Sequence, residues 1–302
     1  MIERSRFRVQ GTYTALVTPF CNDAERTIDW KAFDTLVLDQ VAGEVEGVVV
    51  SGSTGESPTL TPQEQLDLVR HAVGCAKGKV KVFAGTGSYS TRESIERSRA
   101  AEKEGVDGLM LVVPYYNRPT QDGLVEHFVT VASAVECPVI LYNVPGRTGA
   151  DLSSESFARI CEKAGNVVAL KDAAGSVVRT QETIRLLGSR IDVLTGDDAL
   201  TLATVAAGGQ GVISVASNLF PREVSDATRS MLDGKWEEGR RRHYDLLPIY
   251  EACFLESNPG PIKAALSLRK KIENNLRLPL VSVRESTLRA IEKSLMIYEK
   301  RA

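Results

Sequence analysis

The sequence predicts an α/β protein, a (β/α)8 TIM barrel followed by a C-terminal helical extension. Eight short apolar, β-branched runs lie before about residue 225 and alternate with helix-like stretches. Their starts are spaced as expected for βα units, and a barrel of this kind needs about 250 residues. A doubly wound open sheet is the alternative. It is less favoured because no glycine-rich phosphate fingerprint follows the first run.

The eight predicted strands are mostly continuous apolar runs, as expected for parallel strands that are covered on both faces. Thr61, Pro62 and Glu64 form the pattern of a capping box with proline in the first turn of a helix. Ser90 and Ser153 are candidate N-caps of two other helices. The strands are predicted at 11–16, 47–50, 80–84, 108–113, 138–142, 167–171, 191–195 and 211–215.

No strand-like run follows residue 222, and the rest of the chain reads as helices punctuated by glycine and proline. We therefore divide the chain into a barrel domain, residues 1–222, and a helical extension, residues 223–302. The extension is expected to pack beside the barrel or against another subunit. Its helices are predicted at 222–232, 236–256, 261–271 and 284–301.

Composition and charge exclude several classes of protein. The net charge of -2 indicates neither nucleic-acid binding nor attraction to an anionic membrane. No apolar run approaches the roughly 20 residues that cross a bilayer, and residues 1–6 lack the apolar segment of a secretory signal. The five cysteines are scattered, which is typical of reduced thiols in a cytoplasmic protein rather than of disulfides or a zinc site.

The reactive side chains of such a barrel should lie at the C-terminal ends of its strands. Lys171 ends the sixth strand directly after an apolar run. Burial there would lower its pKa, and a neutral amine can attack a ketone to form a Schiff base. The alternatives are a lysine that extends to solvent at the barrel rim, or an ion pair with Asp172.

Other strand ends carry hydroxyl, phenol and guanidinium groups. Ser53 and Thr54 lie in a glycine-bracketed turn that could bind a carboxylate, or be a plain turn. Tyr116 lies in a proline-bounded loop that could equally pack in an interface. Tyr142 ends the fifth strand, and Arg147 after it could bind a carboxylate with two hydrogen bonds or lie on the surface.

A metal site is not indicated. Asp197 and Asp198 follow the seventh strand, but no histidine is near them, and His71, His127 and His243 show no ligand spacing. We interpret the two aspartates as turn or helix-capping residues. The remaining groups suit amine catalysis with proton transfer through hydroxyls, without metal or cofactor.

Taken together, these segments resemble the dihydrodipicolinate synthase family. It belongs to a superfamily of pyruvate aldolases and lyases that includes N-acetylneuraminate lyase. The matching pieces are Gly-Ser-Thr-Gly-Glu at 52–56, Pro-Tyr-Tyr-Asn-Arg-Pro at 114–119, Tyr-Asn-Val-Pro-Gly-Arg-Thr-Gly at 142–149, Leu-Lys-Asp at 170–172, Gly-Val-Ile-Ser at 211–214 and, more weakly, Asn-Pro-Gly-Pro-Ile-Lys at 258–263.

The resemblance implies condensation of pyruvate with L-aspartate 4-semialdehyde to give 4-hydroxy-tetrahydrodipicolinate, in the diaminopimelate branch of lysine biosynthesis. Lys171 would form the Schiff base. Tyr142, the hydroxyl at position 53 or 54, and Tyr116 would form a proton relay, with Tyr116 reaching the site of a neighbouring subunit. A homo-oligomer is therefore expected, most simply a tetramer made of two tight dimers. Ser53 stands where the synthase often has threonine, and its rotamer is less fixed.

The resemblance also implies substrate-binding roles. Thr54 would bind the pyruvate carboxylate and Arg147 the carboxylate of the semialdehyde, while Gly196 and Ile213 would line the pocket with backbone carbonyls. The alternative is another pyruvate-dependent lyase that cleaves a sialic acid or a keto-deoxy sugar acid, and Arg147 argues against it. A catalytically inactive barrel is disfavoured because the lysine and the tyrosines are all present.

Many members of the family are inhibited by L-lysine, bound in a cleft between paired subunits. Glu93 and Tyr115 match the residues of that cleft. Pro62 and Gln65 replace two histidines, and Tyr89 replaces an asparagine. Because proline has no side-chain hydrogen-bonding group, weak or absent inhibition is expected. The positions that correspond to the cleft are Pro58, Pro62, Gln65, Tyr89, Glu93 and Tyr115.

Overall fold

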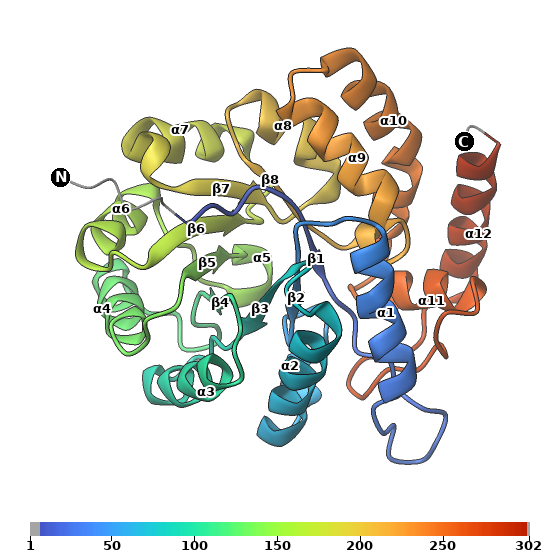
Figure 1. Cartoon of the computed structure of the whole chain (residues 1–302), viewed down its shortest axis with the longest axis horizontal. Helices are drawn as coiled ribbons and strands as arrows, with labels where there is room; N and C mark the ends of the chain where they lie inside the picture. The colour runs from blue at the N-terminus through green and yellow to red at the C-terminus, as the bar shows by residue number, and fades with distance from the viewer. Residues whose placement is uncertain (1–6, 301–302) are drawn as a thin grey trace.

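The computed structural model describes residues 7–300, and the segment 1–6, for which no secretory signal is expected, lies outside them. Eight parallel strands form a closed barrel in chain order, with β8 pairing to β1 (Figure 1). This confirms the predicted fold and excludes the open sheet. The strands are β1 (Gly11–Ala15), β2 (Gly47–Val50), β3 (Lys81–Gly85), β4 (Gly108–Val112), β5 (Val139–Asn143), β6 (Val167–Asp172), β7 (Asp192–Thr195) and β8 (Gly211–Ser214).

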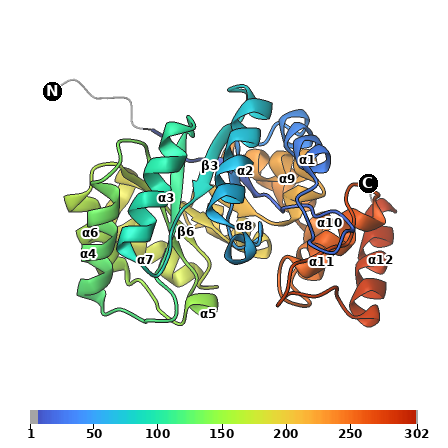
Figure 2. The ribbon, with the colours of Figure 1, turned by 90° about the horizontal axis from the view of Figure 1, so that it is seen from below.

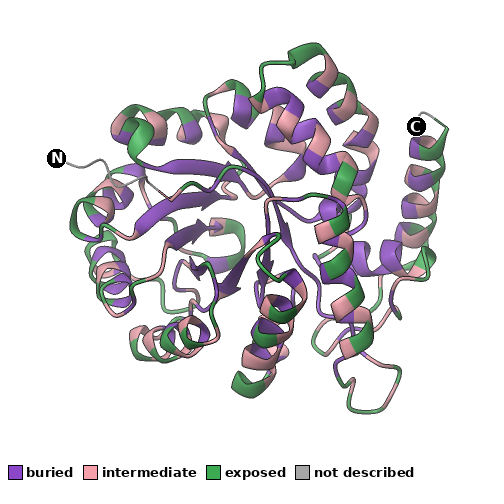
Figure 3. Ribbon diagram, viewed as in Figure 1, coloured by how far each residue is buried: buried purple, intermediate pink, exposed green. Residues whose placement is uncertain are grey.

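Helices surround the barrel, and their buried stripes face the strands (Figure 3). The capping box of α2 is confirmed, because the Thr61 hydroxyl accepts from the Glu64 N–H at 3.2 Å and the Glu64 carboxylate accepts from the Thr61 N–H at 2.8 Å. Ser90 and Ser153 also cap helices as predicted. The helices are α1 (Trp30–Ala42), α2 (Pro62–Ala76), α3 (Thr91–Lys103), α4 (Gln121–Ala132), α5 (Pro145–Thr148), α6 (Ser154–Lys163), α7 (Val177–Leu187), α8 (Thr201–Ala206) and α9 (Pro221–Leu232), with short 3-10 turns at Ser57–Thr59, Gly188–Arg190, Asp198–Leu200 and Ala216–Asn218.

The extension consists of α10 (Trp236–Ala252), α11 (Gly260–Leu268) and α12 (Glu285–Glu299), at one end of the molecule in Figure 2. The helical prediction is confirmed, but α10 ends before the predicted residue 256. Phe254 and Leu255 beyond it are exposed, so no apolar face continues there. None of the helices between residues 7 and 300 combines the length and the apolar character needed to span a membrane.

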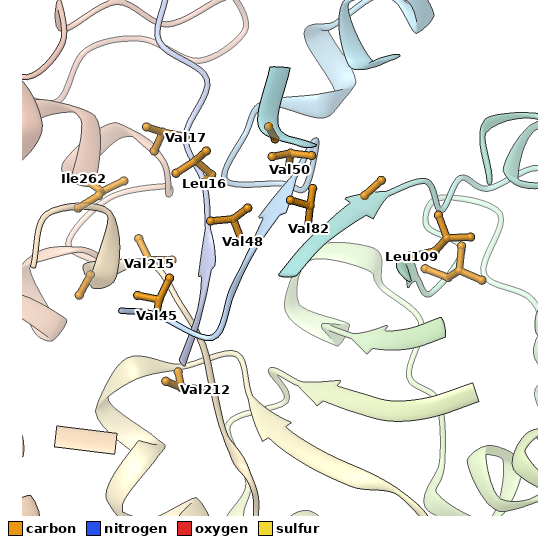
Figure 4. Packing of buried hydrophobic residues seen from close by; sticks show 14 of the residues in the cluster. Leu16, Val17, Val45, Val48, Val50, Val82, Leu109, Val212, Val215 and Ile262 are labelled. Carbon is orange, nitrogen blue, oxygen red and sulfur yellow. The ribbon is translucent and has the colours of Figure 1, made fainter. Parts of the chain in front are cut away.

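The boundary between barrel and extension depends on α9. This helix packs against β1 and α1 and completes the ring of barrel helices, whereas the predicted boundary after residue 222 cuts through its first turn. We propose that the barrel ends after α9. The extension shares the barrel's core, because Ile262 of α11 belongs to the same buried apolar cluster as Leu16 and Val17 (Figure 4).

A second apolar cluster fills the inside of the barrel, where Tyr13, Phe83, Ile140, Leu194 and Ile213 are all buried. Side chains of a strand alternate between its two faces, so these residues point inward while their neighbours pack against the helices. Because the interior is filled, substrates can be bound only at an end of the barrel.

Candidate active site

Lys171 lies near the C-terminal end of β6, and it is only 4% exposed. The alternative of a lysine at the solvent-exposed rim is therefore wrong. Asp172 points to the opposite face of the strand, and its carboxylate accepts from the Ala174 N–H at 3.1 Å. A Cβ atom at Gly196 would lie 2.8 Å from the Lys171 Cε, so glycine is needed there for the lysine side chain to pass.

The electrostatic environment of Lys171 favours its neutral form. Burial and, to a smaller extent, the positive charge of Arg147 lower its pKa to about 7, while Asp198 opposes the shift. An ordinary lysine has a pKa of about 10.4. At neutral pH a large fraction of Lys171 is thus a free amine, which is the nucleophilic form.

Tyr142 and Ser53 lie next to this amine. Tyr142 pairs with Lys171 in the register of β5 and β6, and the Lys171 Nζ lies 4.1 Å from the centre of the phenol ring. Burial raises the pKa of Tyr142, while the nearby Ser53 side chain acts in the opposite direction. The structure therefore brings together three of the predicted catalytic residues.

Thr54 and Arg147 meet at a residue that the sequence analysis did not single out. The Asn258 amide nitrogen donates to the Thr54 hydroxyl at 2.8 Å, and the Asn258 carbonyl accepts from the Arg147 Nη2 at 3.1 Å. Asn258 comes from the extension, between α10 and α11. The one signal for it was the weak family match at 258–263.

A cleft of about 460 Å³ at the C-terminal ends of the strands is lined by Ser53, Tyr142 and Arg147. Lys171, Thr54 and Asn258 do not line it, and Lys171 lies behind the Tyr142 ring. Arg147, on the short helix α5, is exposed at the cleft, where a guanidinium can meet an incoming anion. The lining combines reactive residues with residues of the predicted L-lysine cleft, including Ser53, Tyr142, Arg147, Tyr89, Glu93 and Tyr115.

Tyr116 lies apart from the other predicted site residues, because it is 90% exposed, adopts a φ of 69° and does not line the cleft. The Ile213 side chain is completely buried in the barrel interior, in the same apolar cluster as Tyr142. Within one subunit, the site therefore contains Lys171, Tyr142 and Ser53, and Tyr116 stays outside it.

The interpretation of the two aspartates after β7 is half right. Asp197 accepts from the Ala199 N–H at 3.0 Å and caps a 3-10 turn, as predicted. Asp198 is fully buried, and its carboxylate binds the Ser214 hydroxyl and the Val215 N–H instead. Its partners come from β8 and the residue after it, which adjacency in sequence could not reveal. In the part of the chain that the structure describes, no group of three potential metal-ligating residues occurs.

A buried lysine of lowered pKa at the end of a barrel strand, next to a phenol, is the arrangement of an amine-dependent barrel enzyme. Residues 8–297 match the Dihydrodipicolinate synthetase family. The chain is 51% identical to the 4-hydroxy-tetrahydrodipicolinate synthase of Sorangium cellulosum over 98% of both chains. It is 45% identical to that of Nitratidesulfovibrio vulgaris over 93% of this chain and 97% of the relative.

Solved structures agree with this match. The synthase of Methylacidiphilum fumariolicum is 43% identical and superposes with a TM-score of 0.95 over 97% of both chains. That of Aquifex aeolicus is 39% identical, with a TM-score of 0.94 over 96% of this chain and 98% of the other. The chain belongs to the dihydrodipicolinate synthetase family, and it is an enzyme of the lyase class.

Proposed function

We propose that the enzyme condenses pyruvate with L-aspartate 4-semialdehyde to give 4-hydroxy-tetrahydrodipicolinate, in the diaminopimelate branch of lysine biosynthesis. The observation that carries the mechanism is the buried Lys171 amine, with its pKa near 7, beside Tyr142. Relatives of 51% and 45% identity bear the name of this synthase. A solved relative from Acinetobacter baumannii, 36% identical, is described as complexed with pyruvate.

The reaction begins when the Lys171 amine attacks the ketone carbon of pyruvate and water leaves, giving a protonated imine. The imine accepts the electron pair left when a methyl proton departs, which produces an enamine. The enamine carbon attacks the aldehyde of the second substrate. The amine of that substrate then attacks the imine carbon and releases Lys171. The face of the Tyr142 ring lies toward the nitrogen that carries the positive charge.

Proton transfer and substrate binding use the neighbouring groups. Ser53 lies close enough to Tyr142 to lower its pKa, and the two hydroxyls would carry protons to and from the reacting atoms. Thr54 would bind the pyruvate carboxylate, and Arg147 the carboxylate of the semialdehyde. The backbone carbonyls of Gly196 and Ile213 would complete the pocket. No metal or organic cofactor is required, because the protonated imine is itself the electron sink.

Borohydride reduction in the presence of pyruvate tests this proposal. It should add one reduced pyruvyl group per subunit, on the peptide that contains Lys171, with Lys263 as the internal control. Lys263 is also buried, with its pKa lowered to about 8, but its amine is paired with the Glu56 carboxylate at 2.6 Å. An adduct on Lys263, or on no lysine, would exclude the mechanism.

A homo-oligomer, most simply a tetramer of two tight dimers, is part of the proposal. Tyr116 is exposed and lies outside its own cleft, so its phenol is available to a neighbouring subunit. Lys171→Ala and Tyr116→Phe should each be weakly active alone and regain activity when they are unfolded and refolded together. Mixed oligomers contain sites with an intact lysine and a neighbour's tyrosine. Mixtures no more active than the two variants alone, or full activity in a stable monomer, would contradict this role.

We propose that L-lysine inhibits this enzyme weakly or not at all, although a relative from Cyanidioschyzon merolae, 36% identical, has a structure with lysine bound. The Glu93 carboxylate already pairs with Arg97, and the Gln65 amide donates to the Ser57 carbonyl at 2.9 Å. The Tyr89 ring packs edge-on against the Tyr115 ring, and the two ring centres are 5.3 Å apart. A ligand ammonium would have to displace Arg97. Half-inhibition by submillimolar L-lysine at saturating pyruvate would show the opposite.

We place the enzyme in the cytoplasm. Cys21, Cys75, Cys137 and Cys253 are free thiols, which persist in reducing compartments. Recovery of the enzyme outside the cytoplasmic fraction of its cells would overturn this assignment.

A further inference from the structure

Two buried contacts join the Gly52–Glu56 turn to the start of the extension's second helix. Asn258 Nδ2 donates to the Thr54 Oγ1 at 2.8 Å, and Lys263 Nζ contacts the Glu56 Oε1 at 2.6 Å. All four residues are at most 4% exposed. Because Asn258 precedes α11 and Lys263 lies in its first turn, the two contacts fix this segment on the turn that carries Thr54.

The direction of the first hydrogen bond matters for an anionic ligand. An asparagine Nδ2 group can only donate, so the Thr54 oxygen acts as the acceptor. The proton of the Thr54 hydroxyl is then left to be donated elsewhere, and a carboxylate accepts such a proton well. Asn258 also accepts from Arg147, but through its backbone carbonyl. Changes to the Asn258 side chain should therefore affect Thr54 and spare Arg147.

We propose that Asn258 is a positioning residue for pyruvate. Its amide orients the Thr54 hydroxyl so that the hydroxyl donates to the pyruvate carboxylate. This inference rests on the proposed function, because it takes Thr54 as the group that binds this carboxylate. It extends that function by assigning part of substrate recognition to a residue outside the barrel.

The first test compares Asn258→Ala with Asn258→Asp in steady-state kinetics. Loss of one neutral hydrogen bond should raise the KM for pyruvate by about 3- to 10-fold. Asn258→Asp preserves the size but reverses the direction of the bond, since Thr54 must then donate to the new carboxylate. The added negative charge also repels pyruvate, so the KM for pyruvate should rise further, by about 10- to 100-fold. For Asn258→Ala the KM for the semialdehyde should stay within about twofold, because the carbonyl that accepts from Arg147 is retained.

The second test asks whether Asn258 acts through Thr54. If it does, Asn258→Ala should add little to the effect of Thr54→Val on the KM for pyruvate, because interacting residues are not additive. Asn275→Ala is the matched control. It removes a hydrogen bond of the extension to the Phe20 carbonyl, 3.2 Å long, without touching Thr54. This control should leave both KM values unchanged.

The inference is overturned if Asn258→Ala raises both KM values equally, or if its effect is as large in the Thr54→Val background as in the wild type. If Asn258→Ala does not fold, the same comparison uses Asn258→Ser and Asn258→Asp. A KM for pyruvate that is no higher in Asn258→Asp than in Asn258→Ser contradicts the proposal. Borohydride trapping of pyruvate by the wild type separates failure of the proposed function from failure of this inference. Absence of trapping refutes the Schiff-base function itself. Trapping without a selective rise in the KM for pyruvate in Asn258→Ala refutes only the role of Asn258.

Discussion

Capture of pyruvate by Lys171 should become faster as the pH rises through about 7 and level off above about 8.5. Burial and Arg147 lower the pKa of this amine to about 7. Only the deprotonated amine attacks, so about a tenth of the enzyme is competent at pH 6 and about nine tenths at pH 8. A lysine with an ordinary pKa of about 10.4 would be less than about 1% deprotonated at pH 8. The measurement is the initial rate of borohydride-trapped adduct at subsaturating pyruvate.

Two variants sharpen this prediction. Lys171→Ala should form no adduct and lose on the order of 10³-fold or more in kcat, as other enzymes do when they lose a covalent nucleophile. Arg147→Met removes a positive charge that disfavours the ammonium form, so the pKa of Lys171 should rise and the midpoint should move to higher pH. A rate that does not change between pH 6 and 9, or a midpoint near 10, would show that Lys171 is not activated in this way.

The fold and the centre of the site were predictable because the signals are local. A continuous apolar run predicts a buried parallel strand, and a polar residue that ends such a run must lie at the end of the barrel. This logic located Lys171 on β6 and Tyr142 on β5, and their lateral contact follows from the pairing of neighbouring strands. The capping box at Thr61 was equally local, since its partners are three residues apart.

The residues that were missed depend on contacts between distant parts of the chain. Asn258 reaches Thr54 across 204 positions, and Lys263 reaches Glu56 across 207. Neither contact follows from periodicity or spacing, because it depends on how the extension packs on the barrel. Charged residues such as Glu56 and Lys263 are also usually assigned to the surface, and here both side chains are inaccessible to solvent.

Lys263→Met should destabilise the enzyme strongly. The Glu56 carboxylate accepts from Lys263 at 2.6 Å and from the Arg277 N–H at 3.1 Å, and the lysine also lies 4.3 Å from the Phe20 ring centre. Removing the lysine leaves a buried carboxylate without its cation. Breaking a buried ion pair on one side lowers the free energy of unfolding by about 3–5 kcal/mol. Urea denaturation followed by circular dichroism at fixed protein concentration measures the difference.

The pair is nevertheless not expected to be a large net source of stability. Burial lowers the pKa of Lys263 to about 8 in spite of the adjacent Glu56, so desolvation of the ammonium outweighs the attraction of the carboxylate. The double variant Lys263→Met/Glu56→Gln should therefore regain most of the lost stability, because replacing both partners of a buried pair is often nearly neutral.

Lys271→Met is the surface control. Its pair with Asp39 at 2.5 Å is about one-third exposed, and its loss should cost only about 0–1 kcal/mol. Equal losses for Lys263→Met and Lys271→Met would show that burial of the Glu56–Lys263 pair has no energetic consequence.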